Sequence, residues 1–297
     1  MNCIYLLVIG ELMLKKIGIY AKTNHPDAEQ IAATICERFK REQIEVLLED
    51  SLAEQIGQVN GHAGEEIPEQ VDLIIVLGGD GTLISVARLI GNRNVPLVGV
   101  NLGRLGFLTE VTRDELPEML ERLISGDYHV SDRMMLDASI YRNDRVVGQF
   151  TVLNDIVINK GALARIIDME TSVDGRHLTS YKADGLIIST PTGSTGYNLA
   201  AGGPIIYPDI NSLLITPICP HMLTNRPIMV WSRSVIEIKV SFEDDVVFFT
   251  GDGQVGRKLL PGDRVQVRRS DARTRLVSSP SKDYFEILRT KLNWGQR

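Results

Sequence analysis

One loop of this 297-residue chain combines the residue types that phosphate chemistry requires: Gly78-Gly79-Asp80-Gly81-Thr82. Three glycines in four positions allow the backbone to adopt positive φ and to bring its N–H groups close to an anion. A carboxylate in such a loop repels phosphates unless it holds a divalent cation or accepts a proton from a nucleophile. The alternative is an ordinary strand-to-helix turn in which Asp80 only caps the helix.

Two other polar groups interrupt apolar segments. Asn154-Asp155 lies inside the apolar run 152–158, and burying an unpaired amide and carboxylate is costly, so we expect a ligand or a tight network there. A β-bulge with a local Asx turn remains an open alternative. Lys182 and Asp184 precede the apolar run 185–189 and place a cation and an acid near a strand end, where a simple salt bridge is the alternative.

The stretch 190–203 is rich in glycines and hydroxyls and contains Tyr197. This combination suits phosphate oxygens, ribose hydroxyls and an aromatic stacking face, although a flexible surface loop has the same composition. The segment Gly251 to Gly256 matches G-x-G-x-x-G but lies between two β-type segments, so we interpret it as a turn carrying Gln254. The five histidines lack metal-ligand spacing.

Strands and helices alternate around the Asp80 loop. We predict strands at 16–21, 45–48, 73–77 and 96–100, helices at 26–39, 83–90 and 114–125, and a polar surface connection at 52–70. This alternation indicates right-handed βαβ units and a parallel sheet. The loop then lies where a central buried strand meets a helix.

The pattern changes near Tyr128. Apolar and polar residues alternate over 133–159, 166–189, 235–240, 246–250 and 264–269, with turns at Asn143-Asp144 and Asp174-Gly175, which is typical of antiparallel sheet. We therefore expect an N-terminal extension at 1–15, an α/β domain at 16–127 and a β-rich, sandwich-like domain at 128–281. The tail 282–297 has apolar residues that could pack back on the first domain.

Composition narrows the class of protein. A net charge of −6 and a pI of about 5.5 argue against nucleic acid as the main partner. Three distant cysteines argue against a disulfide framework or a zinc site, so the cytoplasm is the expected location. The apolar segment 3–10 is too short to span a membrane. We expect residues 1–12 to be dispensable, so that a protein starting at Met13 keeps its activity and melting temperature.

Taken together, these blocks resemble the NAD kinase family. GGDGT at Gly78, NLGRLGFLTE at Asn101, NDIVI at Asn154, DGLIISTPTGSTGYNLAAGGPI at Asp184 and DGQ at Asp252 follow the family's order and cover nearly the whole chain from Lys16. GGDGT alone is shared with 6-phosphofructokinases and with diacylglycerol and sphingosine kinases. The resemblance implies an α/β domain, a β-rich domain and phosphorylation of the 2′-hydroxyl of the adenosine ribose of NAD.

The resemblance also implies roles for individual residues. Asp80 is the expected general base, with Gly81 beside the reacting ribose and Gly78, Gly79, Gly81 and Thr82 forming the phosphate-binding loop. The other expected NAD-binding residues are Phe107 near the adenine, Asn154 and Asp155 at ribose hydroxyls, Arg165, Lys182 and Asp184 along the dinucleotide, Thr195, Gly196, Tyr197, Asn198, Leu199 and Ala200 at the adenosine, and Gln254 closing the pocket. The family commonly has Asn-Glu where this chain has Asn154-Asp155, and Ala where it has Gly196.

The expected mechanism is in-line phosphoryl transfer from ATP, another nucleotide or polyphosphate, with Mg²⁺ neutralising the donor phosphates. Family members are typically homodimers or homotetramers in which a neighbouring subunit completes the site. A lipid or sugar kinase with the same loop is one competing hypothesis. A non-catalytic NAD sensor is another, although the presence of Asp80 favours an enzyme.

Overall fold

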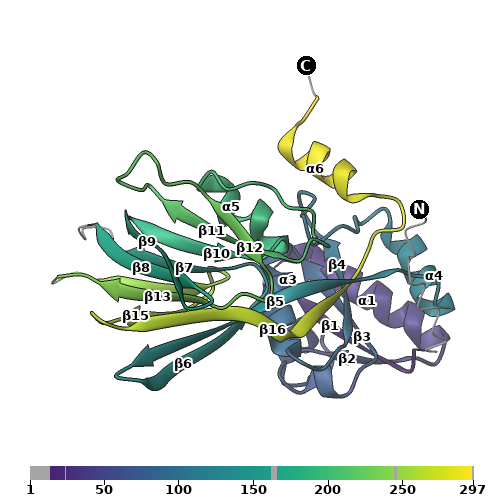
Figure 1. Ribbon diagram of the computed structural model, residues 1–297. Coiled ribbons are helices and arrows are strands. Elements are labelled where there is room, and N and C mark those ends of the chain that lie inside the picture. Colours follow the sequence, from purple (N-terminus) through teal and green to yellow (C-terminus); the bar gives the residue numbers. More distant parts are fainter. Residues whose placement is uncertain (1–13, 24, 162–165, 244–245, 296–297) are drawn as a thin grey trace. The chain divides into compact units, whose positions relative to one another are not determined.

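The computed structural model describes residues 14–23, 25–161, 166–243 and 246–295 (Figure 1). The chain divides into two compact units. Unit 1 comprises the described residues up to Asp132 together with those from Thr274 onward, and unit 2 runs from Arg133 to Arg273. The predicted N-terminal extension lies almost wholly outside the described residues.

Unit 1 is built on a parallel sheet. Its strands are β1 (Lys16–Ala21), β2 (Glu45–Leu48), β3 (Leu73–Gly78) and β4 (Pro96–Asn101), in the order β2-β1-β3-β4. The last residues of β16 (Arg264–Val277) extend the sheet, because Arg275 and Leu276 pair in parallel with Pro96 and Leu97 of β4. All six residues of β3 are buried, as expected of a strand covered on both faces.

Helices cover both faces of this sheet. They are α1 (Pro26–Arg41), α2 (Asp50–Gln55), α3 (Asp80–Ile90) and α4 (Leu116–Ser125), with a 3-10 turn η1 (Ile67–Glu69). The last helix, α6 (Tyr284–Leu292), also belongs to unit 1. The buried faces of α1 and α4 share one apolar core with alternate residues of β1, β3 and β4. On the opposite face, Leu83 of α3 packs against Gly99. A Cβ added to Gly99 would lie only 2.6 Å from a methyl group of Leu83.

The stretch 52–70 differs from the prediction. It contains α2 and η1, and Leu52, Ala53 and Ile67 are buried in the interior of unit 1. These two elements are too short to produce a visible helical repeat in the sequence. The connection is therefore partly core rather than wholly surface.

Unit 2 contains two antiparallel sheets. In one, β5 (Val130–Arg142) and β6 (Arg145–Val152) join the first part of β16, followed by β13 (Ile236–Ser241), β8 (Ile167–Val173) and β9 (Arg176–Ala183). The other has the order β12-β11-β10-β7-β14-β15, formed by Ile228–Trp231, Ser212–Ile218, Gly185–Ser189, Asp155–Lys160, Val247–Gly251 and Val255–Leu259. Their inner faces share one apolar core, as in a β-sandwich.

Tight turns fix the register of three hairpins in unit 2. Asn143-Asp144, Asp174-Gly175 and Asp252-Gly253 have positive φ at both residues, the backbone of a type I′ turn. The first two turns were predicted from the sequence and are confirmed. The third confirms that the segment Gly251 to Gly256 is a hairpin turn between β14 and β15 rather than a dinucleotide loop opening a helix.

Candidate active site

The Asp80 loop leaves the carboxyl end of β3 and opens α3, as the sequence predicts. Gly79 is the N-cap of the helix and Asp80 is its first residue. A Cβ on Gly78 would lie 2.6 Å from Thr82 Oγ1, so glycine is required there. In the strand order β2-β1-β3-β4, the chain leaves β1 and β3 in opposite directions, and this switch point is where α/β sheets bind ligands.

The Asp80 carboxylate is held by a loop that follows β4. Its Oδ2 accepts a hydrogen bond from the Phe107 N–H (2.8 Å). Its Oδ1 accepts bonds from the Leu108 N–H (3.0 Å), the Thr109 N–H (2.9 Å) and Thr109 Oγ1 (3.0 Å). The capping alternative therefore does not hold, because Gly79 occupies the cap position and the carboxylate bonds residues 107–109.

Three residues outside the predicted site support this anchor. A Cβ on Gly106 would lie 2.0 Å from Asp80 Oδ1, so the loop passes close only because this residue is glycine. Asn101 donates through Nδ2 to Thr109 Oγ1 (2.8 Å), and its Oδ1 accepts from the Gly103 N–H (2.7 Å). Asn101, Gly106 and Thr109 lie in the NLGRLGFLTE block, which was the sequence signal for them.

Phe107 is half-buried beside the Asp80 loop, where its backbone N–H bonds the carboxylate. Lys291 of α6 lies 5.3 Å from the centre of its ring, within the range of a cation–π contact. The structure therefore places this aromatic face within unit 1, close to the predicted catalytic acid. Its expected contact with adenine remains a prediction.

In unit 2, Asn154 and Asp155 lie where β7 begins. The register of β7 with β10 and with β14 is continuous, so the β-bulge alternative is wrong. Asn154 Oδ1 is buried and has no hydrogen-bond partner within the part of the chain that the structure describes. An orphaned buried acceptor of this kind is expected where a ligand donates.

Asp155 is 5% exposed, and its environment is unusual for a carboxylate. Burial, followed by the negative charge of Asp252, raises its pKa to about 7. Near neutral pH it is therefore partly a neutral acid that can donate a hydrogen bond as well as accept one. Asp252 was part of the DGQ block but was not among the predicted site residues.

The loop after β10 is ordered rather than a flexible surface loop. It contains a 3-10 turn η2 (Thr192–Thr195) and a short helix α5 (Tyr197–Ala200). A Cβ on Gly196 would lie 3.7 Å from Asn154 Nδ2 and 3.8 Å from Asp155 Oδ2, so the loop adjoins both. Within the loop, the side chains of Tyr197 and Ala200 are exposed, as is Gly196.

Asn198 has a different position from its neighbours. It is fully buried, donates through Nδ2 to the carbonyls of Ser194 (3.0 Å) and Pro204 (3.1 Å), and accepts from Thr216 Oγ1 (2.6 Å). Its side chain is thus occupied by the protein itself. These bonds hold the loop, and its expected contact with the adenosine stays a prediction, as it does for the partly exposed Thr195 and Leu199.

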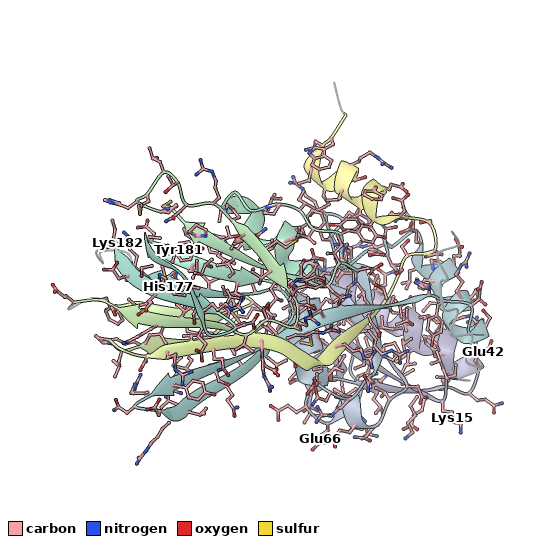
Figure 2. The ribbon with its side chains drawn as sticks, viewed as in Figure 1. Lys15, Glu42, Glu66, His177, Tyr181 and Lys182 are labelled. Carbon is pink, nitrogen blue, oxygen red and sulfur yellow. The ribbon has the colours of Figure 1, made fainter. Side chains whose placement is uncertain are left out.

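Lys182 and Asp184 lie at the other end of β10. Ser189 pairs with Asp155, whereas Gly185, which follows Asp184, pairs with Asn159, four residues or about 13 Å further along the strand. Asp184 forms an ion pair with Lys160 (2.8 Å), so the acid is in a salt bridge, but with a partner outside the predicted cluster. The exposed Lys182 (Figure 2) is 3.8 Å from Asp168. Within one chain the structure does not bring this pair to Asn154.

The remaining predictions are placed as follows. Gln254 is exposed in the β14–β15 turn, with its N–H donating to the Gly251 carbonyl (3.0 Å). Arg165 lies outside the described residues. Among the described residues, no group of three or more His, Cys, Asp or Glu side chains could hold a metal ion. No described helix is long and apolar enough to cross a membrane.

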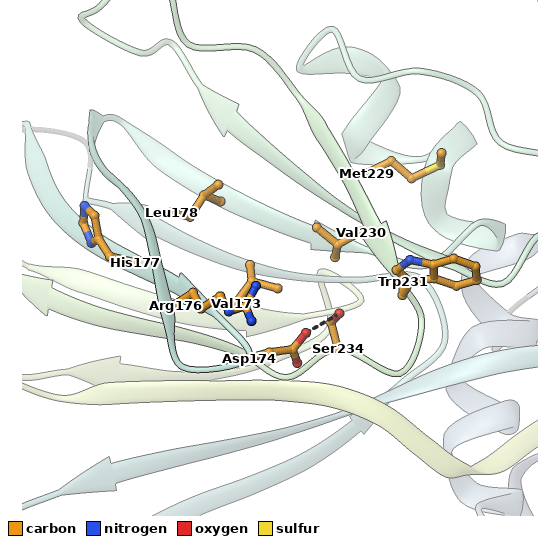
Figure 3. Close-up of a pocket in the computed structure, with 9 residues that line it drawn as sticks. All are labelled: Val173, Asp174, Arg176, His177, Leu178, Met229, Val230, Trp231 and Ser234. Atoms are coloured by element: carbon orange, nitrogen blue, oxygen red, sulfur yellow. Dashed lines mark hydrogen bonds between the residues drawn. The ribbon is translucent and has the colours of Figure 1, made fainter.

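A separate hollow of about 550 Å³ lies in unit 2 beside the β8–β9 hairpin and β12 (Figure 3). It is lined by Val173, Asp174, Arg176, His177, Leu178, Met229, Val230, Trp231 and Ser234. These residues are all different from the predicted site residues. Asp174, which lines this hollow, is therefore a suitable control position outside the predicted site.

Two family models match the chain. The ATP-NAD kinase N-terminal domain matches residues 17–128, and the ATP-NAD kinase C-terminal domain matches residues 153–279. Among curated proteins, NAD kinase of Syntrophotalea carbinolica is 57% identical over 285 residues, which are 96% of this chain and all of that protein. NAD kinase of Geotalea daltonii is 56% identical over 284 residues, with the same coverage.

Solved structures are similar over nearly the full length. Yeast NADH kinase complexed with NADH has a TM-score of 0.88 at 26% identity, covering 97% of this chain and 90% of that one. An NAD kinase from Archaeoglobus fulgidus in complex with ATP has a TM-score of 0.75 at 24% identity, covering 93% and 99%, and shows the same fold. The fold and the acidic glycine-rich loop thus define a kinase. With both models matched and relatives above 50% identity, the chain belongs to the NAD kinase family. The predicted fold class is confirmed.

Proposed function

We propose that this protein transfers a phosphoryl group to the 2′-hydroxyl of the adenosine ribose of NAD and so makes NADP. The observation that carries the proposal is the Asp80 carboxylate, fixed by four hydrogen bonds beside a glycine-rich loop at the carboxyl end of β3. An acid placed there is suited to proton transfer, and the adjoining N–H groups are suited to phosphoryl oxygens.

Asp80 is the proposed general base. Its Oδ1 already accepts three hydrogen bonds, whereas Oδ2 accepts the one from Phe107 and has capacity for a further donor. A hydroxyl approaching Oδ2 can therefore give its proton to Asp80 as its oxygen attacks the donor phosphorus in line, while the bond from that phosphorus to the bridging oxygen breaks and the shortened donor leaves with that oxygen. The Thr82 N–H donates to the Gly79 carbonyl (3.0 Å), so it is the positive end of α3, capped by Gly79, that would stabilise charge on the transferring group.

Asn154 and Asp155 are the proposed partners of the ribose hydroxyls. The unpartnered Asn154 Oδ1 would accept from one hydroxyl, and the partly protonated Asp155 can donate to or accept from another. Tyr197 is 47% exposed beside them and offers a face for stacking. An alanine at Gly196 would bring its Cβ 3.2 Å from the Gly193 carbonyl, so glycine leaves slightly more room.

The donor is proposed to be ATP, another nucleoside triphosphate or polyphosphate, entering with Mg²⁺ as part of the substrate. In such complexes the cation is held mainly by phosphate oxygens and one or two carboxylates, where it neutralises phosphate charge. Asp80 is the carboxylate within the proposed phosphate-binding loop.

We also propose a cytoplasmic homodimer or homotetramer. Met229 and Trp231 on the edge strand β12 are 56% and 67% exposed, which gives a second copy an apolar face to cover. Self-association would give Lys182 and Asp184 a route to the dinucleotide of a neighbouring subunit. Light scattering coupled to size exclusion tests the oligomeric state.

One assay tests the proposed function. Purified protein is incubated with NAD or NADH, Mg²⁺ and either ATP or polyphosphate, and the product is identified by phosphorus NMR. We expect phosphate at the 2′ position. Turnover of diacylglycerol or fructose 6-phosphate in place of NAD would favour the competing kinase class. NAD binding without turnover would favour a sensor.

A further inference from the structure

Asp252 is tied to the predicted ribose-binding residues by an unusual set of bonds. Its Oδ1 accepts from the N–H groups of Asn154 (2.7 Å) and Asp155 (3.3 Å), and its Oδ2 accepts from the Leu153 N–H (3.0 Å). Its own N–H donates to the Asp155 carbonyl (2.9 Å). One residue in a hairpin turn thus binds three consecutive residues of a distant segment.

These bonds decide where the side chains of 154 and 155 point. Asn154 precedes β7 and Asp155 is its first residue, so the ladder hydrogen bonds of the strand fix the chain only beyond this point. On the other side, the Thr190 N–H donates to the Asn154 carbonyl (2.9 Å), and Gly193 packs directly on that carbonyl. On the N–H side, Leu153 and Asn154 both donate to Asp252.

Asp252 also acts on Asp155 through its charge. The elements packed around the Asp155 side chain contribute Ser189 from β10, Gly196 from the following loop and the β14–β15 turn with Asp252. Asp252 is the charged group among them, and it adds to burial in favouring the neutral form of Asp155. The bonds of Asp252 therefore position both side chains, and its charge acts on Asp155.

We propose that Asp252 is a positioning residue for the acceptor ribose: it fixes the backbone of residues 153–155 and thereby aims the Asn154 amide and the Asp155 carboxyl at the ribose hydroxyls. The inference rests on the proposed function, because it takes these two side chains as the ribose partners. It adds a residue that acts through them without touching the substrate.

The chain offers a matched control in Asp174. This residue is also the first of an Asp-Gly turn with positive φ (51°, compared with 53° at Asp252). Its carboxylate accepts from the Val235 N–H (2.8 Å) and from Ser234 Oγ (2.9 Å), beside the hollow shown in Figure 3. The two turns thus have the same chemistry but hold different segments.

The test compares Asp252→Asn with Asp174→Asn. Asparagine tolerates positive φ, but its NH₂ group would face the Leu153 N–H, so the bond at Oδ2 is lost. For Asp252→Asn we expect the KM for NAD and its calorimetric Kd to rise about 10- to 100-fold, the range found when residues that orient metal ligands are replaced. The KM for ATP should be nearly unchanged. For Asp174→Asn we expect values within twofold of wild type at a comparable loss of melting temperature.

The pH dependence separates positioning from general destabilisation. In the wild type, NAD affinity should change near pH 7 as Asp155 ionises, and in Asp252→Asn this change should move to lower pH because the repelling charge is gone. Wild-type NAD affinity and pH profile in Asp252→Asn would overturn the proposal, as would equal losses in Asp174→Asn. If Asp252→Asn does not fold, Asp252→Gly, which also accepts positive φ, takes its place.

The two proposals fail in different ways. A wild-type protein that makes NADP, combined with an Asp252→Asn variant of normal NAD affinity, overturns only the role of Asp252. A wild-type protein that neither binds nor phosphorylates NAD overturns the proposed function and this inference with it. If NAD binds without turnover, the calorimetric comparison of the two variants still decides the role of Asp252.

Discussion

Replacing Asp80 would affect two functions at once, so a single substitution cannot separate them. It anchors residues 107–109, and it is the proposed base. Thr109→Val is the informative partner, because it removes the hydroxyl bond to Oδ1 while keeping the carboxylate and nearly the same side-chain shape.

We expect Asp80→Asn to lower kcat by about 10²–10⁴, the usual contribution of a positioned base. Its NH₂ group would also oppose the Phe107 N–H, so a lower melting temperature is expected. Thr109→Val should lower the melting temperature while reducing kcat by about tenfold or less. Steady-state kinetics and thermal melts on both variants provide the measurement. Equal losses of kcat would show that Asp80 acts only as an anchor.

Asp155 makes stability depend on pH. Burial and the charge of Asp252 raise its pKa to about 7, whereas in an unfolded chain it would be about 4. Between these values the folded protein holds a proton that the unfolded chain has released, so the free energy of unfolding falls as pH rises. That difference of about three in pKa corresponds to roughly 4 kcal/mol.

We therefore expect Asp155→Asn, which keeps the shape and cannot ionise, to lose this slope. The difference in free energy of unfolding, variant minus wild type, should rise by up to roughly 4 kcal/mol as the pH goes from 4 to 8. Urea denaturation at a series of pH values measures it. A difference that stays constant over this range would mean that Asp155 is ionised in the folded protein.

The sequence revealed some of these residues and concealed others. Asp80 and Asn154-Asp155 could be predicted because each interrupts an apolar segment, which is a local signal. Thr109 and Asp252 act on partners 29 and 97–99 positions away in sequence, and local periodicity contains no information on such bonds. Asn198 was expected at the adenosine from the family resemblance, and its bond with Thr216, 18 positions away, is likewise absent from any local pattern.

At the scale of elements, local patterns predicted most of the strands. The predicted bounds of β1 and β2 agree with Lys16–Ala21 and Glu45–Leu48, because short apolar runs end there in polar residues. β16 was predicted only to Arg269 but continues to Val277. The inward positions of its second half include Ser270, Ala272 and Thr274, which are buried yet too small or too polar to appear as an apolar stripe.

The turn between β15 and β16 depends on a buried ion pair. Asp263, whose side chain is 1% exposed, receives two hydrogen bonds from Arg142 (2.9 and 2.8 Å) and one from the Leu260 N–H (2.8 Å). Burial alone would raise the pKa of Asp263, but the bonds from Arg142 and Leu260 outweigh it and lower this pKa. The stabilisation is therefore present above the unfolded pKa and is lost as pH falls.

We expect Asp263→Asn to lower the free energy of unfolding by about 2–3 kcal/mol at pH 7, since it leaves a partly buried guanidinium without its anion. The control is Glu237→Gln, which breaks the more exposed pair with Arg264 (2.6 Å) and should cost about 1 kcal/mol or less. Urea denaturation of both variants measures the difference. Similar losses from the two would contradict the special weight given to the buried pair.

For the whole molecule, the sequence predicted an α/β part and a β-rich part because the period of the apolar residues changes along the chain. The divisions in the structure lie at 132/133 and 273/274, compared with the expected 127/128 and 281/282. β5 and β16 continue across these points as single strands, and a strand period alone does not show where one core ends and the next begins.

Shorter substrates test whether the whole NAD molecule is needed for turnover. If binding energy from the remote half of NAD positions the reacting ribose, AMP or adenosine should lose turnover as well as affinity. We expect kcat for AMP to fall at least tenfold below that for NAD, with the KM also raised. Initial rates with saturating ATP and Mg²⁺ give both constants. Equal kcat values would mean that the nicotinamide half contributes only to binding.

The two separated segments of unit 1 make the order of synthesis matter. When Asn101 leaves the ribosome, β4 has one edge paired with β3. Val111 soon pairs with the end of its other edge, but Arg275 and Leu276, which cover that edge at Pro96 and Leu97, are made about 170 residues later. At ~5–20 residues per second this interval lasts roughly 10–35 s. An open strand edge can pair with another chain. Unit 2, made without interruption, is free to fold in that interval, and the nascent β4 is where chaperones should bind and aggregation should start.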